Sequence, residues 1–246
     1  MPQQTTISLI DKRVVGLGLG LAVAGFFTAY QPITPRLAIV SSLSVVAFAI
    51  PSFWAVVKDL GRKEGLLALL AICFYALLVE TSALKTGFPY GNFIYTNSLG
   101  NKIFGLTPWT VAFAYPPILL LAYWIGRQLK QYWQIISLTA LSAMLVDLVL
   151  DPAAVKLGFW HWLVPGYYYG VPIVNFLGWL LSSAIGAFLL HALYRTRALS
   201  KQLTYSGLAI LWFWTWIEWS VQQWLPAILG TVLSIFLWRY VSSKQV

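Results

Sequence analysis

Four of the seven acidic residues lie inside long apolar stretches, where a charged side chain is costly: Glu80, Asp147, Asp151 and Glu218. A carboxylate at the centre of a bilayer helix costs about 2.5–3.5 kcal/mol on insertion scales, so such residues are functional candidates by default. The alternative interpretation is that each carboxylate accepts hydrogen bonds and fixes the packing of helices.

Asp147 and Asp151 are four residues apart, which places both on one face of a helix. Two carboxylates in a medium of low dielectric constant cannot both ionise cheaply, so one of them is expected to keep its proton. A carboxylic acid beside a carboxylate is the arrangement that a general acid needs. Because Pro152 follows Asp151, we expect the helix to end there, with Asp151 at the mouth of any cavity.

Aromatic side chains are concentrated in the segments 88–109 and 159–169, close to these carboxylates in the sequence. They form either an interfacial belt or a wall of π faces that holds a long apolar ligand. A buried acid beside aromatic faces suits the protonation of an alkene, because the rings and the remaining carboxylates lower the energy of the carbocation.

Other kinds of site are poorly supported by the sequence. His161 and His191 are far apart, so we expect no metal site, and the sequence has no evident ligand pair for a redox cofactor. The single Asp-x-x-x-Asp motif lacks the second Asp-rich motif of membrane prenyltransferases. The net charge of +9 comes from Lys and Arg spread between apolar runs, which favours anionic lipid headgroups over nucleic acid.

The elements that position these residues are expected to be transmembrane helices. Hydrophobic residues make up 59% of the chain and charged residues 9%, whereas soluble domains have about 25% charged residues. A spanning helix needs roughly 20 apolar residues. We predict one all-α membrane domain over residues 1–246, with about eight spans, or seven if the last stretch is a single long helix. The expected spans are 14–30, 37–57, 66–84, 108–129, 135–150, 172–194, 206–221 and 226–240.

The distribution of Lys and Arg predicts the orientation of this bundle. If both termini are cytoplasmic, twelve of the sixteen Lys and Arg lie on the cytoplasmic side, as the positive-inside rule requires. The long connections Lys85–Thr107 and Pro152–Val171 then lie on the outer side. Both are rich in Gly, Pro and aromatic residues, so we expect them to fold down as interfacial or re-entrant segments.

The two connections also resemble each other. Glu80 precedes a Gly-Phe pair by seven residues, and Asp151 does the same. Each connection ends in an aromatic-Gly-aliphatic sequence shortly before a proline, Pro108 or Pro172. This pattern indicates a possible weak internal duplication, in which spans three and four match spans five and six.

Two motifs resemble those of a known family. Thr86–Thr96 (TGFPYGNFIYT) is similar to a signature of the integral-membrane carotenoid 1,2-hydratases, which include γ-carotene 1′-hydratases of photosynthetic bacteria and bacterioruberin hydratases of haloarchaea. Asp147–Pro152 (DLVLDP) and the segment from Gly158 to Trp179 are similar to the second signature of that family. The resemblance covers roughly Glu80 to Trp179.

The resemblance implies cofactor-free addition of water to the C1–C2 double bond of an acyclic carotenoid ψ-end, in a bacterial or archaeal-type cell membrane or a thylakoid. Glu80, Asp147 and Asp151 are the expected acid–base cluster, with Asp147 or Asp151 as proton donor and Glu80 positioning or deprotonating the water. The expected substrate-binding residues, whose amides orient water or whose rings shield the cation, are Tyr90, Asn92, Tyr95, Trp160, Tyr168 and Asn175, together with the buried acid Glu218. The expected partners are the carotenoid, membrane lipids and other enzymes of the carotenoid pathway.

Two other functions stay open at this point. A carotenoid cyclase would use the same protonation but capture the cation with an internal alkene, which needs a dry pocket. A binding or transport protein for an isoprenoid lipid would use the carboxylates to pack helices or relay protons. Replacing Asp147 and Asp151 by Asn would then leave its function mostly intact.

Overall fold

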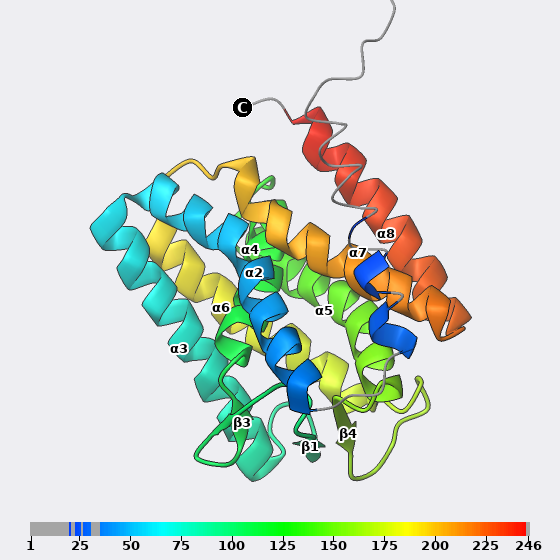
Figure 1. Ribbon diagram of the computed structural model, residues 1–246. Coiled ribbons are helices and arrows are strands. Elements are labelled where there is room, and N and C mark those ends of the chain that lie inside the picture. Colours follow the sequence, from blue (N-terminus) through cyan, green and yellow to red (C-terminus); the bar gives the residue numbers. More distant parts are fainter. Residues whose placement is uncertain (1–19, 21–22, 26, 31–34, 245–246) are drawn as a thin grey trace, which may run out of the picture.

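The protein is a bundle of helices with short strands at one end, as the computed structural model in Figure 1 shows. The structure describes residues 20, 23–25, 27–30 and 35–244. Its long helices are α2 (Pro35–Leu60), α3 (Arg62–Thr86), α4 (Val111–Gly126), α5 (Tyr132–Lys156), α6 (Ile173–Tyr194), α7 (Tyr205–Ser220) and α8 (Trp224–Ser243), with a 3-10 helix, η1 (Lys201–Thr204), before α7. About half of the first expected span, 14–30, lies outside the described residues.

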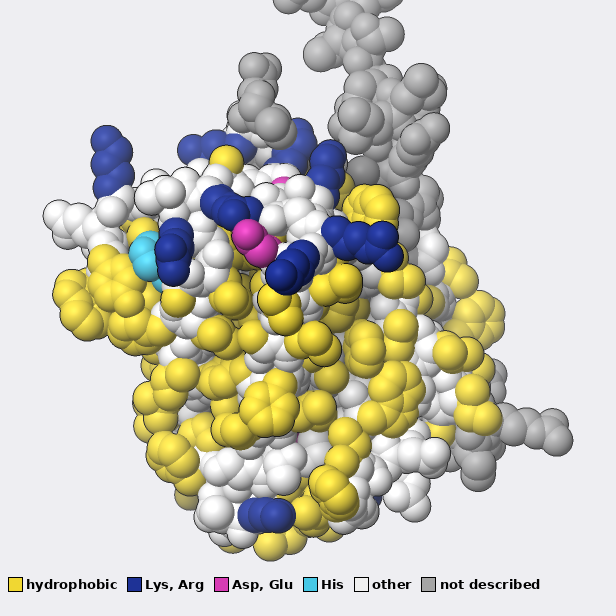
Figure 2. Space-filling view, turned by 90° about the vertical axis from the view of Figure 1, so that its left-hand side faces the viewer, with side chains coloured by type: hydrophobic (Ala, Val, Ile, Leu, Met, Phe, Trp, Pro, Cys, Tyr) yellow, Lys and Arg dark blue, Asp and Glu magenta, His cyan; other side chains and the backbone are white. Residues whose placement is uncertain are grey.

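Five helices of the described chain, α2, α3, α5, α6 and α8, are long and apolar enough to cross a membrane, and α4 is a shorter apolar helix. Their outward faces carry large hydrophobic side chains such as Trp54, Leu70 and Phe74, each about two-thirds exposed. Figure 2 shows a broad hydrophobic belt on this side of the molecule, with Lys and Arg gathered above it. Such a surface is stable against lipid and not against water.

The two ends of the bundle differ in character. One end, which we call the loop end, is formed by residues 87–110 and 157–172 and carries the strands. The opposite end, which we call the basic end, is formed by the connections around Leu60–Arg62, Gly126–Tyr132 and Tyr194–Lys201. At the basic end Arg197 forms an ion pair of 2.6 Å with Glu64 and donates to the Leu60 carbonyl.

Helix α4 lies at the centre of the bundle and is buried on almost every side, including Leu119, Leu121 and Tyr123. Two glycines of neighbouring helices allow this close packing. A Cβ on Gly186 of α6 would approach Leu119 to 2.6 Å, and one on Gly207 of α7 would approach Leu121 to 2.5 Å. Helix α4 therefore holds α6 and α7 at fixed positions around the core.

The helix that carries the acidic pair does not end at Asp151, so that prediction is wrong. Helix α5 continues through Pro152 to Lys156. A proline inside a helix has no N–H to offer to the carbonyl four residues earlier. The Tyr168 hydroxyl supplies the missing donor, with a hydrogen bond of 3.0 Å to the Leu148 carbonyl.

Helix α7 and the turn after it support the same part of α5. The carboxylate of Glu218 lies against the backbone N–H of Ala153. The Gln223 side-chain amide satisfies two acceptors when its nitrogen faces α5. In this orientation the nitrogen donates to Glu218 Oε2 at 2.7 Å and to the Pro152 carbonyl at 3.3 Å. Contacts from distant elements thus replace the helix bonds that Pro152 disturbs.

The prediction of an all-α chain omitted four short strands. β1 (Phe93–Tyr95) pairs antiparallel with β4 (Trp160–Trp162), and β2 (Lys102–Ile103) pairs with β3 (Thr107–Pro108). The β1–β4 ladder places Tyr95 opposite Trp160 and Phe93 opposite Trp162. The two long connections are therefore joined to each other at the loop end, while the chain remains mostly helical.

Candidate functional site

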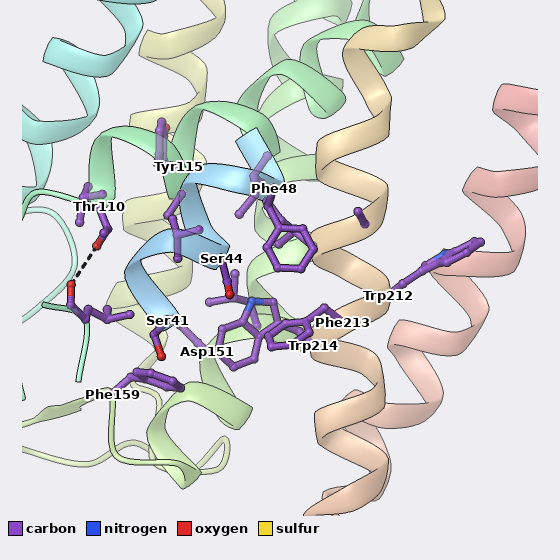
Figure 3. Close-up of a pocket in the computed structure, with 18 of the residues that line it drawn as sticks. Ser41, Ser44, Phe48, Thr110, Tyr115, Asp151, Phe159, Trp212, Phe213 and Trp214 are labelled. Carbon is purple, nitrogen blue, oxygen red and sulfur yellow. Dashed lines mark hydrogen bonds between the residues drawn. The ribbon is translucent and has the colours of Figure 1, made fainter. Parts of the chain in front are cut away.

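A cavity of about 990 Å³ lies between α2 and α7 and extends to the loop end (Figure 3). Its wall is largely apolar and aromatic. Figure 3 shows residues from α2, α4, α5, α7 and the connection after α5 around this space, among them Phe48, Tyr115, Asp151, Phe159 and Trp214. Glu80 and Asn175 also line it, so two carboxylates and an amide face a largely apolar space.

The two aspartates of α5 are bridged by a single amide. Asn175, near the start of α6, donates from Nδ2 to Asp147 Oδ2 at 2.8 Å and to Asp151 Oδ2 at 2.5 Å. All three side chains are buried, with exposed fractions of 0%, 3% and 2% for Asp147, Asp151 and Asn175. The two carboxyl groups also interact directly with each other, as their four-residue spacing predicted.

The members of the acidic pair differ in their access to the cavity. Asp151 lines it, whereas Asp147 lies one helical turn deeper and does not. Oδ1 of Asp147 is buried and has no hydrogen-bond partner within the described part of the chain. Asp151 is therefore the member of the pair that faces the cavity, and Asp147 lies behind it, joined to it through the Asn175 amide.

Glu80 approaches the same cavity from α3. The Tyr95 hydroxyl on β1 donates a hydrogen bond of 2.8 Å to Glu80 Oε1. Burial raises the pKa of the Tyr95 phenol well above its usual range, and the charge of Glu80 adds to this effect, so Tyr95 stays a donor. Glu80 and Asp151 are also close enough to interact electrostatically. The structure thus brings Glu80, Asp147 and Asp151 together.

Aromatic side chains of the paired connections surround the carboxylates. The Trp160 ring packs edge-on against Tyr95 at 5.5 Å, and its indole interacts with the Asp151 carboxylate. Tyr90 is buried, and its hydroxyl donates to Ser182 Oγ at 2.9 Å while its carbonyl accepts from the Trp162 indole. Tyr90, Tyr95 and Trp160 all line the cavity.

Three of the predicted substrate-binding residues lie outside the cavity wall. Asn92 is exposed and lies against the turn at Gly87. Tyr168 and Glu218 contact the backbone of α5 on either side of Pro152. No group of three His, Cys, Asp or Glu side chains in the described part of the chain is arranged to hold a metal ion.

Sequence reasoning missed the part of the wall that comes from α2 and α7. Phe48 is a single aromatic residue in an apolar run, and nothing in the sequence distinguishes it. Phe213 and Trp214 belong to Trp212–Trp214, three consecutive aromatic residues that could have indicated a ligand-binding wall. This segment matches no motif used in the sequence analysis. All three residues line the cavity.

Comparison with known proteins places the chain among carotenoid biosynthesis proteins. A family model described as carotenoid biosynthesis protein matches residues 37–237. The bisanhydrobacterioruberin hydratase of Haloarcula japonica is 33% identical over 190 residues, which are 72% of this chain and 64% of the relative. The chain therefore spans less than two thirds of the length of that relative. No solved structure matches the chain.

Proposed function

Because the chain belongs to the carotenoid biosynthesis protein family, as a membrane protein related to a carotenoid hydratase, we propose that it adds water to the C1–C2 double bond of an acyclic carotenoid ψ-end. The observation that carries this proposal is the position of Asp151 and Glu80. They come from different helices, line one apolar cavity and are surrounded by aromatic rings.

In the proposed reaction Asp151 is the general acid, because it is the aspartate that lines the cavity. For two buried carboxyl groups that share the Asn175 amide, the state with one proton between them has the lowest free energy. Asp151 gives this proton to C2. The electron pair of the double bond forms the new C2–H bond and leaves a tertiary cation at C1.

Water then attacks C1, and Glu80 accepts one proton from this water. The Tyr95 hydroxyl holds the Glu80 carboxylate in place while this happens. The faces of Trp160 and Tyr90, which line the cavity, lower the energy of the cation. Return of the proton from Glu80 to Asp151 restores both groups, so the net change is the addition of one water molecule.

We further propose eight spans with both termini in the cytoplasm, so that the basic end is the cytoplasmic end. Clustering of Lys and Arg at that end supports this orientation. The carboxylates then lie toward the outer face of the membrane. Other enzymes of the carotenoid pathway are the proposed partners, because the substrate and product both stay in the bilayer.

The test is expression in a bacterium that accumulates lycopene, followed by mass and absorption measurements on the pigments. We expect a product heavier by one water with an unchanged visible spectrum, since the C1–C2 bond is isolated from the conjugated system. An unchanged mass with altered absorption would identify a cyclase instead. Unmodified lycopene, with the protein present in the membrane, would refute both enzyme functions and favour a binding or transport protein.

A further inference from the structure

We propose that the part of the cavity between α2 and α7 binds the polyene chain of the substrate, parallel to the helix axes. This inference rests on the proposed function, because it assigns the rest of the molecule whose end reacts at Asp151. We call this part of the cavity the α2–α7 channel. Its wall includes Ala47, Phe48, Pro51, Ala209, Phe213 and Trp214.

A continuous series of ring contacts leads from the loop end into the channel. Phe159, at the loop end, lies 5.9 Å from Trp214 between ring centroids. Trp214 lies 5.4 Å from Phe213, and Phe213 lies 5.4 Å from Phe48 of α2. All four rings line the cavity, and Figure 3 shows them around the space between the two helices. A conjugated chain presents a π face along its whole length, and aromatic rings pack well against such a face.

Small residues leave room for this chain between the rings. Ala47 and Pro51 are four residues apart and so lie on one face of α2, and Ala209 lines the cavity from α7. The stretch of α7 from Tyr205 to Trp214 that borders the cavity is about 14 Å long at the usual helical rise. The channel can therefore follow part of the length of a polyene.

The far end of the channel has a different chemistry. Lys201, Tyr205 and Ser242 line the cavity near the basic end of the bundle. Lys201 belongs to η1, Tyr205 begins α7 and Ser242 is in the last turn of α8. The reacting ψ-end therefore lies at the loop end, and the second end group of the carotenoid lies at the basic end, where a hydroxyl group would find polar side chains.

The test fills the channel from either wall without changing the carboxylates. Ala47→Phe acts from α2 and Ala209→Phe acts from α7. Val232→Phe on α8 is the matched control, because Val232 is 58% exposed on the outer surface and does not line the cavity. Two quantities are measured for each variant: hydrated carotenoid per unit of protein in lycopene-producing cells, and lycopene retained by the protein purified in mild detergent.

We expect both quantities to fall roughly tenfold or more in the two channel variants, and to change by less than about twofold in the control. Melting temperatures in detergent identify a variant that misfolds, and Ala47→Leu and Ala209→Leu, which add less volume, then take its place. Hydration and lycopene retention at the unmodified level in a folded channel variant would overturn the inference. A different result would separate the two proposals. If the unmodified protein retains lycopene, the channel variants lose it and no variant hydrates it, the proposed function is wrong but the assignment of the channel is supported.

Discussion

The hydroxyl of Tyr95 donates a hydrogen bond of 2.8 Å to Oε1 of Glu80 and so connects strand β1 to helix α3. The two residues are 15 positions apart in the sequence. Tyr95 is in turn paired with Trp160 across the β1–β4 ladder. The orientation of the Glu80 carboxylate therefore depends on both long connections.

Tyr95→Phe removes this hydrogen bond and keeps the ring. Hydrogen bonds to charged groups are worth about 1.5–3 kcal/mol, so we expect roughly a tenfold to hundredfold loss of turnover with little change in protein level. Turnover is measured as hydrated pigment per unit of protein. Tyr167→Phe is the control, because Tyr167 is fully exposed. Equal activity of the two variants would show that Tyr95 does not position the carboxylate.

Asp151→Asn and Asp147→Asn separate the member of the acidic pair that faces the cavity from the deeper one. General acid catalysis contributes about 10²–10⁴-fold, so Asp151→Asn should lower turnover by that factor. Asp147→Asn should cost less, because Asp147 does not line the cavity and acts through Asp151. The comparison requires equal amounts of folded protein. A larger loss in Asp147→Asn would assign the proton donor to the deeper residue.

Asn175→Ala removes the amide donor that the two aspartates share. Leaving buried polar groups unpaired costs about 1–3 kcal/mol, and more when they are charged, so we expect a lower melting temperature in detergent. Asn97→Ala is the control, because Asn97 is exposed in the same part of the molecule. An unchanged melting temperature in Asn175→Ala would mean that water or lipid replaces the amide without cost.

Glu218→Ala tests the support of α5 at Pro152. The change removes the carboxylate that lies against the Ala153 N–H and accepts from Gln223, so we expect destabilisation of about 1–3 kcal/mol and a lower melting temperature. Glu218→Gln keeps an acceptor oxygen and should restore most of the stability. Glu64→Ala breaks an exposed ion pair, whose usual contribution is about 0–1 kcal/mol, and serves as the control. If Glu218→Gln is as unstable as Glu218→Ala, the charge of Glu218 matters and not its hydrogen bond.

Some of this site followed from local spacing. The four-residue interval of Asp147 and Asp151 predicted that they share a face of one helix, and Asn175 indeed contacts both. Glu80 was grouped with them from its expected depth in the membrane, and it lines the same cavity as Asp151. The catalytic roles of these residues, the number of spans and the internal duplication stay predictions.

Other features depend on contacts that local patterns do not contain. Proline predicted the end of α5, but Tyr168 and Glu218, which lie 16 and 66 residues beyond Pro152 in the sequence, satisfy the backbone there. The strands β1 and β4 have three residues each, too few for an alternating pattern to be recognised. Their pairing is decided by the helices that bring the two connections together.

The β1–β4 ladder places Phe93, Tyr95, Trp160 and Trp162 over the loop end of the cavity, and all four residues line it. In the proposed reaction the hydrocarbon enters from the bilayer, on the side where α2 and α7 border the cavity, and water enters from the aqueous face at the loop end. The two reactants approach along perpendicular routes. Each of them stays in the phase in which it is soluble until they meet beside Asp151.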